Sequence, residues 1–305
     1  MVLQPARIGQ RLPASPDLSV LDTPPPEPSL PLVSKRDSIR LRLTLHYDGQ
    51  GFHGWQVQPG VPTVQGALES AAARLTGAPR TVLGSGRTDR GVHALGQVAA
   101  ITVPRRWTPA SFRKAMNAVL PNGVWVADAV EARPGFHPRY DARARTYAYR
   151  LGISEASRSP FHRHHCWPLV HRVDRGLLRR LAEPVVGERS FAAFAKAGQP
   201  ERGDRCRVHE AQWTDWSPLG MTFRVTADRY LHHMVRYLVG TMVEVARGRR
   251  PESDFRRLLE EGGRPGPDTP VTSPPAPPQG LFLLAVRYPG DPGTPAHASG
   301  GTDST

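Results

Sequence analysis

The stretch GSGRTDRGVHA, residues 84–94, places one carboxylate, Asp89, between Arg87 and Arg90 on a glycine-rich backbone. If this segment is extended, Arg87 and Asp89 lie on the same face, because side chains alternate along a strand. A guanidinium this close favours the ionised form of a carboxylate, and an ionised carboxylate at an open loop suits a nucleophile. The alternative is an ordinary turn residue or helix N-cap. The glycines expected to let a bulky ligand approach the backbone are Gly84, Gly86 and Gly91.

Two competing chemistries fit this sequence less well. The loop lacks the lysine and hydroxyl ending of a Walker phosphate loop and the G-x-G-x-x-G spacing of a dinucleotide site. The histidine-rich stretches lack the C-x-x-C and H-E-x-x-H spacings of metal sites, and adjacent histidines point in different directions on a helix or strand. We therefore expect no metal and no cofactor, and histidines that are exposed or face RNA. These residues are His162, His164, His165 and Cys166 in one stretch and His232 and His233 in the other.

A second candidate group lies in HHMVRYLVG, residues 232–240. On a helix, His232, Arg236 and Gly240 share one face, away from the apolar stripe. Arg236 is then either part of a solvated face or a firmly placed guanidinium for a phosphate or for Asp89.

A third group lies in FHPRYDARARTYAYR, residues 136–150, where Arg145, Tyr147 and Tyr149 alternate on one strand face with Arg143 in phase. Arginine and aromatic side chains together make a platform for nucleobases and phosphates. One tyrosine, Tyr149, can instead belong to the core, and Tyr147 is then expected near a rim.

The elements that must position these groups follow one order twice. Periodicity predicts β-α-β-β-α-β over residues 38–132 and a similar order over 145–289, which indicates two related α+β halves. Two sheets placed edge to edge would form one long platform with a cleft between the halves. The expected helices cover residues 63–77, 108–123, 173–187 and 232–248; the expected strands include 39–48, 80–85, 96–103, 124–132, 145–153, 208–216, 221–230 and 281–289.

The composition of the chain indicates the class of its binding partner. The chain has 305 residues, a formal net charge of +13 and a sequence pI near 10.7, which favours binding of polyanions, most commonly nucleic acid. It has no apolar run of membrane-spanning length, no secretion signal at its start and only two cysteines, so we expect a cytoplasmic protein with no membrane partner. Residues 1–37 and 291–305 are predicted to be disordered, and residues 262–280 to form a long surface connection.

The loop, extended as GSGRTDRGVHALGQVA, closely resembles the signature of the tRNA pseudouridine synthase A family. Residues 43–69, 136–151, 229–248 and 276–289 also resemble that family in the same order, so that the resemblance spans residues 38–289. It implies two ferredoxin-like halves, 38–137 and 138–290, that form an extended mixed sheet with helices on one face and a central active-site cleft. It also implies a homodimer without cofactor.

The resemblance further implies the reaction and its residues. Asp89 corresponds to the essential aspartate, Arg87 to the arginine that pairs with it, Tyr147 to the tyrosine that stacks on the target base, and Arg236 to the arginine beside the carboxylate. The substrate implied is uridine 38, 39 or 40 in the tRNA anticodon arm. The alternative is a non-catalytic basic RNA-binding protein on the same scaffold, which has no need of Asp89. Besides Tyr147, the residues expected to contact RNA are Arg90, His93, Arg145, His232 and His233.

Overall fold

The computed structural model describes residues 37–196, 203–262 and 270–292. Nearly all of the predicted disordered head and tail therefore lie outside the described residues. Contacts group Lys35–Thr305 into one compact unit, and the predicted division at residue 137 stays a prediction. Within the described ranges, no helix is long and apolar enough to cross a membrane.

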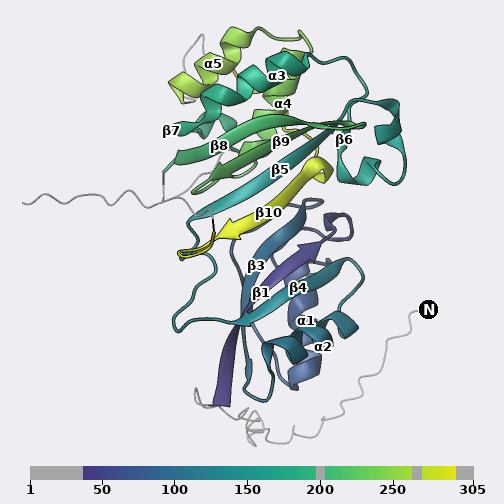
Figure 1. The fold of residues 1–305 in the computed structure, drawn as a ribbon, viewed down its shortest axis with the longest axis vertical. Coiled ribbons are helices and arrows are strands. Elements are labelled where there is room, and N and C mark those ends of the chain that lie inside the picture. The colour runs from purple at the N-terminus through teal and green to yellow at the C-terminus, as the bar shows by residue number, and fades with distance from the viewer. Residues whose placement is uncertain (1–36, 197–202, 263–269, 293–305) are drawn as a thin grey trace, which may run out of the picture. The chain divides into compact units, whose positions relative to one another are not determined.

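One ten-stranded sheet runs through the described part of the chain, with the main order β4-β1-β3-β10-β5-β9-β8-β7 (Figure 1). Neighbours along this path are antiparallel except β10 and β3, which are parallel. The mixed sheet confirms the predicted α+β fold. The strands are β1 (Ser38–Tyr47), β2 (Val82–Gly84, on β3), β3 (His93–Pro104), β4 (Val124–Glu131), β5 (Ala144–Gly152), β6 (Trp167–Pro168, on β5), β7 (Gly187–Ser190), β8 (Arg205–Trp216), β9 (Gly220–Ala227) and β10 (Leu281–Arg287).

The first half of the sheet is formed as its periodicity predicts. Every second residue of β1 is buried, against helices α1 (Val64–Thr76) and α2 (Pro109–Val119). Helix α1 ends at Gly77, which takes the left-handed conformation that glycine adopts without strain. Helix α2 begins at Thr108, whose side chain accepts a hydrogen bond from the Ser111 N–H in a capping box.

The second half contains one helix that the sequence analysis did not predict. Helices α3 (Arg175–Ala182) and α4 (Met234–Ala246) lie where expected, and α5 (Glu252–Glu261) follows them. Phe255, Leu258 and Leu259 of α5 are buried in the core of this half, at a spacing that is helical in the sequence. The described part of the predicted surface connection lies against α4, since the Ala276 N–H donates to the Arg236 carbonyl at 2.9 Å.

Strand β10 joins the two halves, although it comes last in the chain (Figure 1). It pairs with β3 on one side and β5 on the other, and its Leu281 and Leu283 belong to different core clusters. The registers place Ala94, Leu283 and Tyr147 on one continuous face of the sheet, the face that the helices of both halves cover. Groups at the β10 junction on this face are therefore flanked by helices of both halves.

Candidate active site

Asp89 lies in the loop between β2 and β3, which turns directly after this residue. The Val92 N–H donates to the Asp89 carbonyl at 3.1 Å, and Gly91 has a φ of +79°. Gly84 packs against Trp55, because a Cβ there would lie 2.5 Å from the indole ring. Gly84 thus permits this packing and Gly91 the turn, and their expected role in the approach of a ligand stays a prediction.

A buried polar network supports the loop from below. Gln97, which is fully buried, accepts from the Ser85 hydroxyl at 2.6 Å and donates to the Gly86 carbonyl at 3.0 Å. The Tyr47 hydroxyl, also buried, is 2.8 Å from the Thr88 hydroxyl. Because unpaired buried polar groups are costly, these bonds restrict the loop to one position.

The Asp89 side chain is 31% exposed and is paired with three side chains of the second half of the chain. His232 Nε2 lies 3.3 Å from Oδ1, His233 Nε2 lies 3.1 Å from Oδ2, and Arg236 Nη1 lies 3.7 Å from Oδ2. The carboxylate is thus held across the junction by two imidazoles and one guanidinium.

The two adjacent histidines converge on one carboxylate, which contradicts the expectation that they point apart. The reason is that α4 begins only at Met234, and His233 precedes it with a left-handed φ of 65°. In this conformation neither the helical nor the strand rule for side-chain direction applies, and the two rings lie 4.2 Å apart. Burial lowers the pKa of His233, while the Asp89 carboxylate opposes this shift.

Arg236 does not lie on a solvated face, since its side chain is only 13% exposed. Its Nε donates to the Ala276 carbonyl at 2.7 Å, and the same segment covers Gly240, where a Cβ would lie 2.2 Å from the Pro274 carbonyl oxygen. Of the two alternatives that the sequence left open, the structure therefore shows the firmly placed guanidinium beside Asp89.

Tyr147 is half-buried on β5 and packs against the cores of both halves. Its ring meets Tyr230 edge-on, with centroids 4.9 Å apart. Burial raises the pKa of Tyr147 to about 12, with Arg145 opposing the shift and Asp89 adding to it. Tyr149 is fully buried and donates to the Pro277 carbonyl, so Tyr149 is the core tyrosine and Tyr147 the one near the rim.

Comparison with known proteins agrees with this geometry. A model of the tRNA pseudouridine synthase family matches residues 44–141 and 181–289. The chain is 39% identical over 255 residues to the tRNA pseudouridine synthase A of Solibacter usitatus (strain Ellin6076), covering 82% of this chain and 99% of that one. It is 40% identical over 265 residues to that of Myxococcus xanthus, covering 86% and 96%, and 41% identical over 260 residues to that of Solidesulfovibrio magneticus, covering 83% and 92%.

The chain belongs to the tRNA pseudouridine synthase family. Enzymes of this family are isomerases that act on tRNA.

Three further residues that the sequence linked to the tRNA pseudouridine synthase site lie differently from expectation, and a fourth, Arg90, is exposed. Arg87 is exposed, and in the described part of the chain no ion pair joins it to Asp89. His93 is only 1% exposed, with Nε2 donating to the His164 carbonyl at 3.1 Å, so it is not available to RNA here. Arg145 donates to the Ser85 carbonyl at 2.6 Å and thereby holds the loop of Asp89.

Two groups of side chains have the composition of a metal site, and neither was visible in the linear spacing. In each, one aspartate and two histidines place their donor atoms within 4.8 Å of one another. The Asp89 cluster is Asp89, His232 and His233; the junction cluster is Asp48, His93 and His165. The expectation of a metal-free enzyme stays a prediction.

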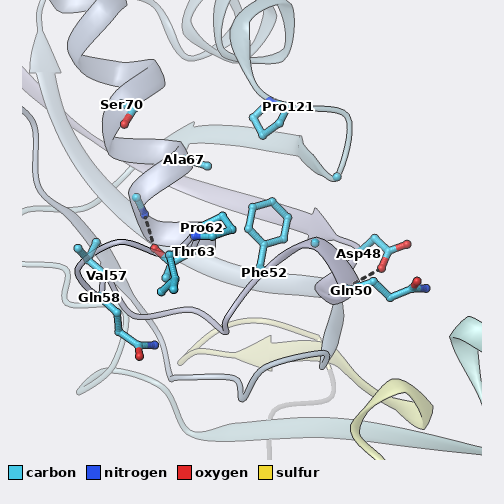
Figure 2. A pocket seen from close by; sticks show the side chains of 14 residues that line it. Asp48, Gln50, Phe52, Val57, Gln58, Pro62, Thr63, Ala67, Ser70 and Pro121 are labelled. Atoms are coloured by element: carbon cyan, nitrogen blue, oxygen red, sulfur yellow. Dashed lines mark hydrogen bonds between the residues drawn. The ribbon is translucent and has the colours of Figure 1, made fainter.

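A hollow of about 740 Å³ lies in the first half, away from Asp89 (Figure 2). It lies between the segment after β1, the first turns of α1 and the turn at Pro121. Phe52, Pro62 and Ala67 point toward it, and Asp48 and Gln50 lie at one end (Figure 2). This hollow is therefore not part of the site around Asp89.

Proposed function

We propose that this chain converts uridine to pseudouridine at positions 38, 39 and 40 of the tRNA anticodon stem-loop, with Asp89 as the catalytic residue. The observation that carries the proposal is the Asp89 carboxylate, which is accessible to ligands and yet held by His232, His233 and Arg236. An oriented carboxylate beside a half-buried tyrosine is the set of groups that this isomerisation requires.

The reaction breaks the N1–C1′ bond, turns the base and forms the C5–C1′ bond, with no net gain or loss of atoms or electrons. Asp89 attacks the base or C1′, or helps to remove the C2′ proton. The target uridine has to leave its stack, which costs a few kcal/mol, and stacking on the Tyr147 ring returns about 1–3 kcal/mol of this. The net charge of +13 supplies attraction to the phosphates.

We also propose the organisation that goes with this reaction. Residues 38–137 form the half that supplies Asp89, and residues 138–290 form the half that supplies Tyr147 and Arg236. The enzyme works in the cytoplasm as a homodimer, without a metal or organic cofactor. Besides Tyr147, the RNA contacts include His232, which is the most exposed member of the Asp89 cluster, and the exposed Arg90.

A non-catalytic RNA-binding protein on the same scaffold is the competing function. Such a protein needs the basic surface and the aromatic platform, but it has no use for a carboxylate among cations at a surface meant for phosphates. Because Asp89 repels the phosphate backbone, its presence favours an enzyme over a non-catalytic RNA-binding protein.

The test is incubation of the full-length protein with an unmodified tRNA transcript that has uridine at positions 38–40, followed by mapping of pseudouridine. We expect pseudouridine at these positions only, and none in a transcript with cytidine there. Pseudouridine elsewhere would overturn the site assignment, and tRNA binding without any pseudouridine would support the competing function.

A further inference from the structure

His233 has a backbone conformation that histidine rarely takes. In the described part of the chain, Val170 and His233 are the residues other than glycine with positive φ, at 48° and 65°. This region is disfavoured for residues with a Cβ, and it persists only where the surroundings enforce it. Residues with such strained conformations are frequent at functional sites, which indicates that the His233 side chain has a functional contact.

The backbone structure at this position does not require a histidine side chain. His233 precedes α4, but its side chain makes no capping hydrogen bond to the helix. The local backbone bonds, from the Tyr237 N–H to the His233 carbonyl and from the Met234 N–H to the Leu231 carbonyl, use main-chain atoms only. Glycine would make the same bonds at a positive φ without strain, and asparagine tolerates this φ better than histidine does.

What only the histidine side chain provides is the contact with Asp89. Its Nε2 lies 3.1 Å from Oδ2. The side chain is 18% exposed, and Arg236, the other partner of Oδ2, is 13% exposed. Oδ1, by contrast, is paired with His232, whose side chain is 45% exposed. The two oxygens of one carboxylate are therefore held by partners of different accessibility.

We propose that His233 is a positioning residue, and that its strained backbone serves to fix Oδ2 of Asp89 so that Oδ1 is the oxygen presented to the target uridine. The substrate can displace the exposed His232 from Oδ1, while the half-enclosed His233 and Arg236 keep Oδ2 in place. This inference rests on the proposed catalytic role of Asp89.

The experiment compares single-turnover rate, tRNA affinity and Tm for the parent, His233→Gly, His233→Gln and Asp89→Asn in the full chain. His233→Gly removes both the imidazole and the strain. We expect its rate to fall about 10- to 100-fold, the range for losing one polar partner of a charged group. Its tRNA affinity should stay within about twofold, and its Tm should not fall, because glycine accepts this φ. His233→Gln keeps a polar N–H group of similar reach and should recover part of the rate. Val170→Gly relieves the same kind of strain away from the site and should keep the parental rate.

Each outcome bears on the inference. A His233→Gly rate equal to the parent's would overturn the positioning role, and a Tm that falls together with the rate would make His233 a merely structural residue. A His233→Gln variant as slow as His233→Gly would overturn the role of the polar contact between residue 233 and Oδ2 of Asp89. A parent that forms no pseudouridine would instead refute the proposed function, and parental activity in Asp89→Asn would refute its catalytic residue.

Discussion

The Asp89 cluster and the junction cluster have the same composition, one aspartate and two histidines, and both connect segments distant in the chain. They differ in how far backbone groups take part. In the junction cluster, His93 receives the Gly49 N–H on Nδ1 and donates from Nε2 to a carbonyl, and Asp48 accepts the Gln50 N–H in addition to its contact with His165. Among the described residues, the carboxylate of Asp89 contacts the side chains of His232, His233 and Arg236.

This difference separates a structural group from a chemical one. Side chains that are bonded to backbone groups help to fix the path of the chain, and a ligand cannot replace those bonds without disturbing the local fold. Side chains that hold one another can exchange partners when a substrate arrives. Residue composition alone would have given both clusters the same role.

The largest expected effect is that of Asp89→Asn. The amide keeps the shape but loses the nucleophile, so we expect the single-turnover rate to fall by more than about 10³-fold with tRNA binding nearly intact. The matched variant Asp48→Asn keeps an oxygen for the Gln50 N–H and should stay within about twofold of the parental rate, with a lowered Tm. The rates are measured by pseudouridine mapping over time. Equal loss of rate in both variants would remove the distinction between the clusters.

The next effect concerns the aromatic ring near the Asp89 cluster. Tyr147→Phe keeps the stacking surface and removes the hydroxyl, and we expect turnover at least about tenfold slower with unchanged tRNA affinity. Tyr147→Leu should also bind the target uridine less well. The control is Tyr149→Phe on the same strand. The Tyr149 hydroxyl donates to the Pro277 carbonyl, so this variant should change Tm more than rate. If Tyr147→Phe is as fast as the parent, Tyr147 is a stacking platform only.

A smaller effect, on stability, is expected in the junction cluster. His93→Leu leaves the Gly49 N–H and the His164 carbonyl without their partner, which we expect to cost about 2–4 kcal/mol and to lower Tm by roughly 5–10 °C. The affinity for tRNA, measured at a temperature where the variant is folded, should not change. Weakened tRNA binding at an unchanged Tm would restore His93 to the RNA-contacting residues.

The last prediction is that pH does not change the ratio of the parent rate to the Tyr147→Phe rate. The pKa of Tyr147 is raised by burial to about 12, so the phenol keeps its proton below that pH and loses it only as the pH approaches 12. The ratio of the parent rate to the Tyr147→Phe rate should therefore stay constant between about pH 7 and pH 9.5. A ratio that changes through this interval would show that Tyr147 ionises in the complex with tRNA.

The sequence alone was sufficient for most of the elements. Alternation in β1 and helical spacing and caps in α1 and α2 are local features, set by the side chains of neighbouring residues. The same reasoning missed α5, although Phe255, Leu258 and Leu259 have helical spacing.

The tertiary structure alone decided which groups meet Asp89. Proximity in the sequence favoured Arg87 as the partner of Asp89, but Arg87 is exposed. The partners of Asp89 instead come from residues 232–236, across the β10 junction. The convergence of His232 and His233 depends on one backbone angle that histidine does not prefer. Local sequence predicts the preferred conformation of each segment, whereas a strained conformation exists only because contacts from distant segments outweigh its cost.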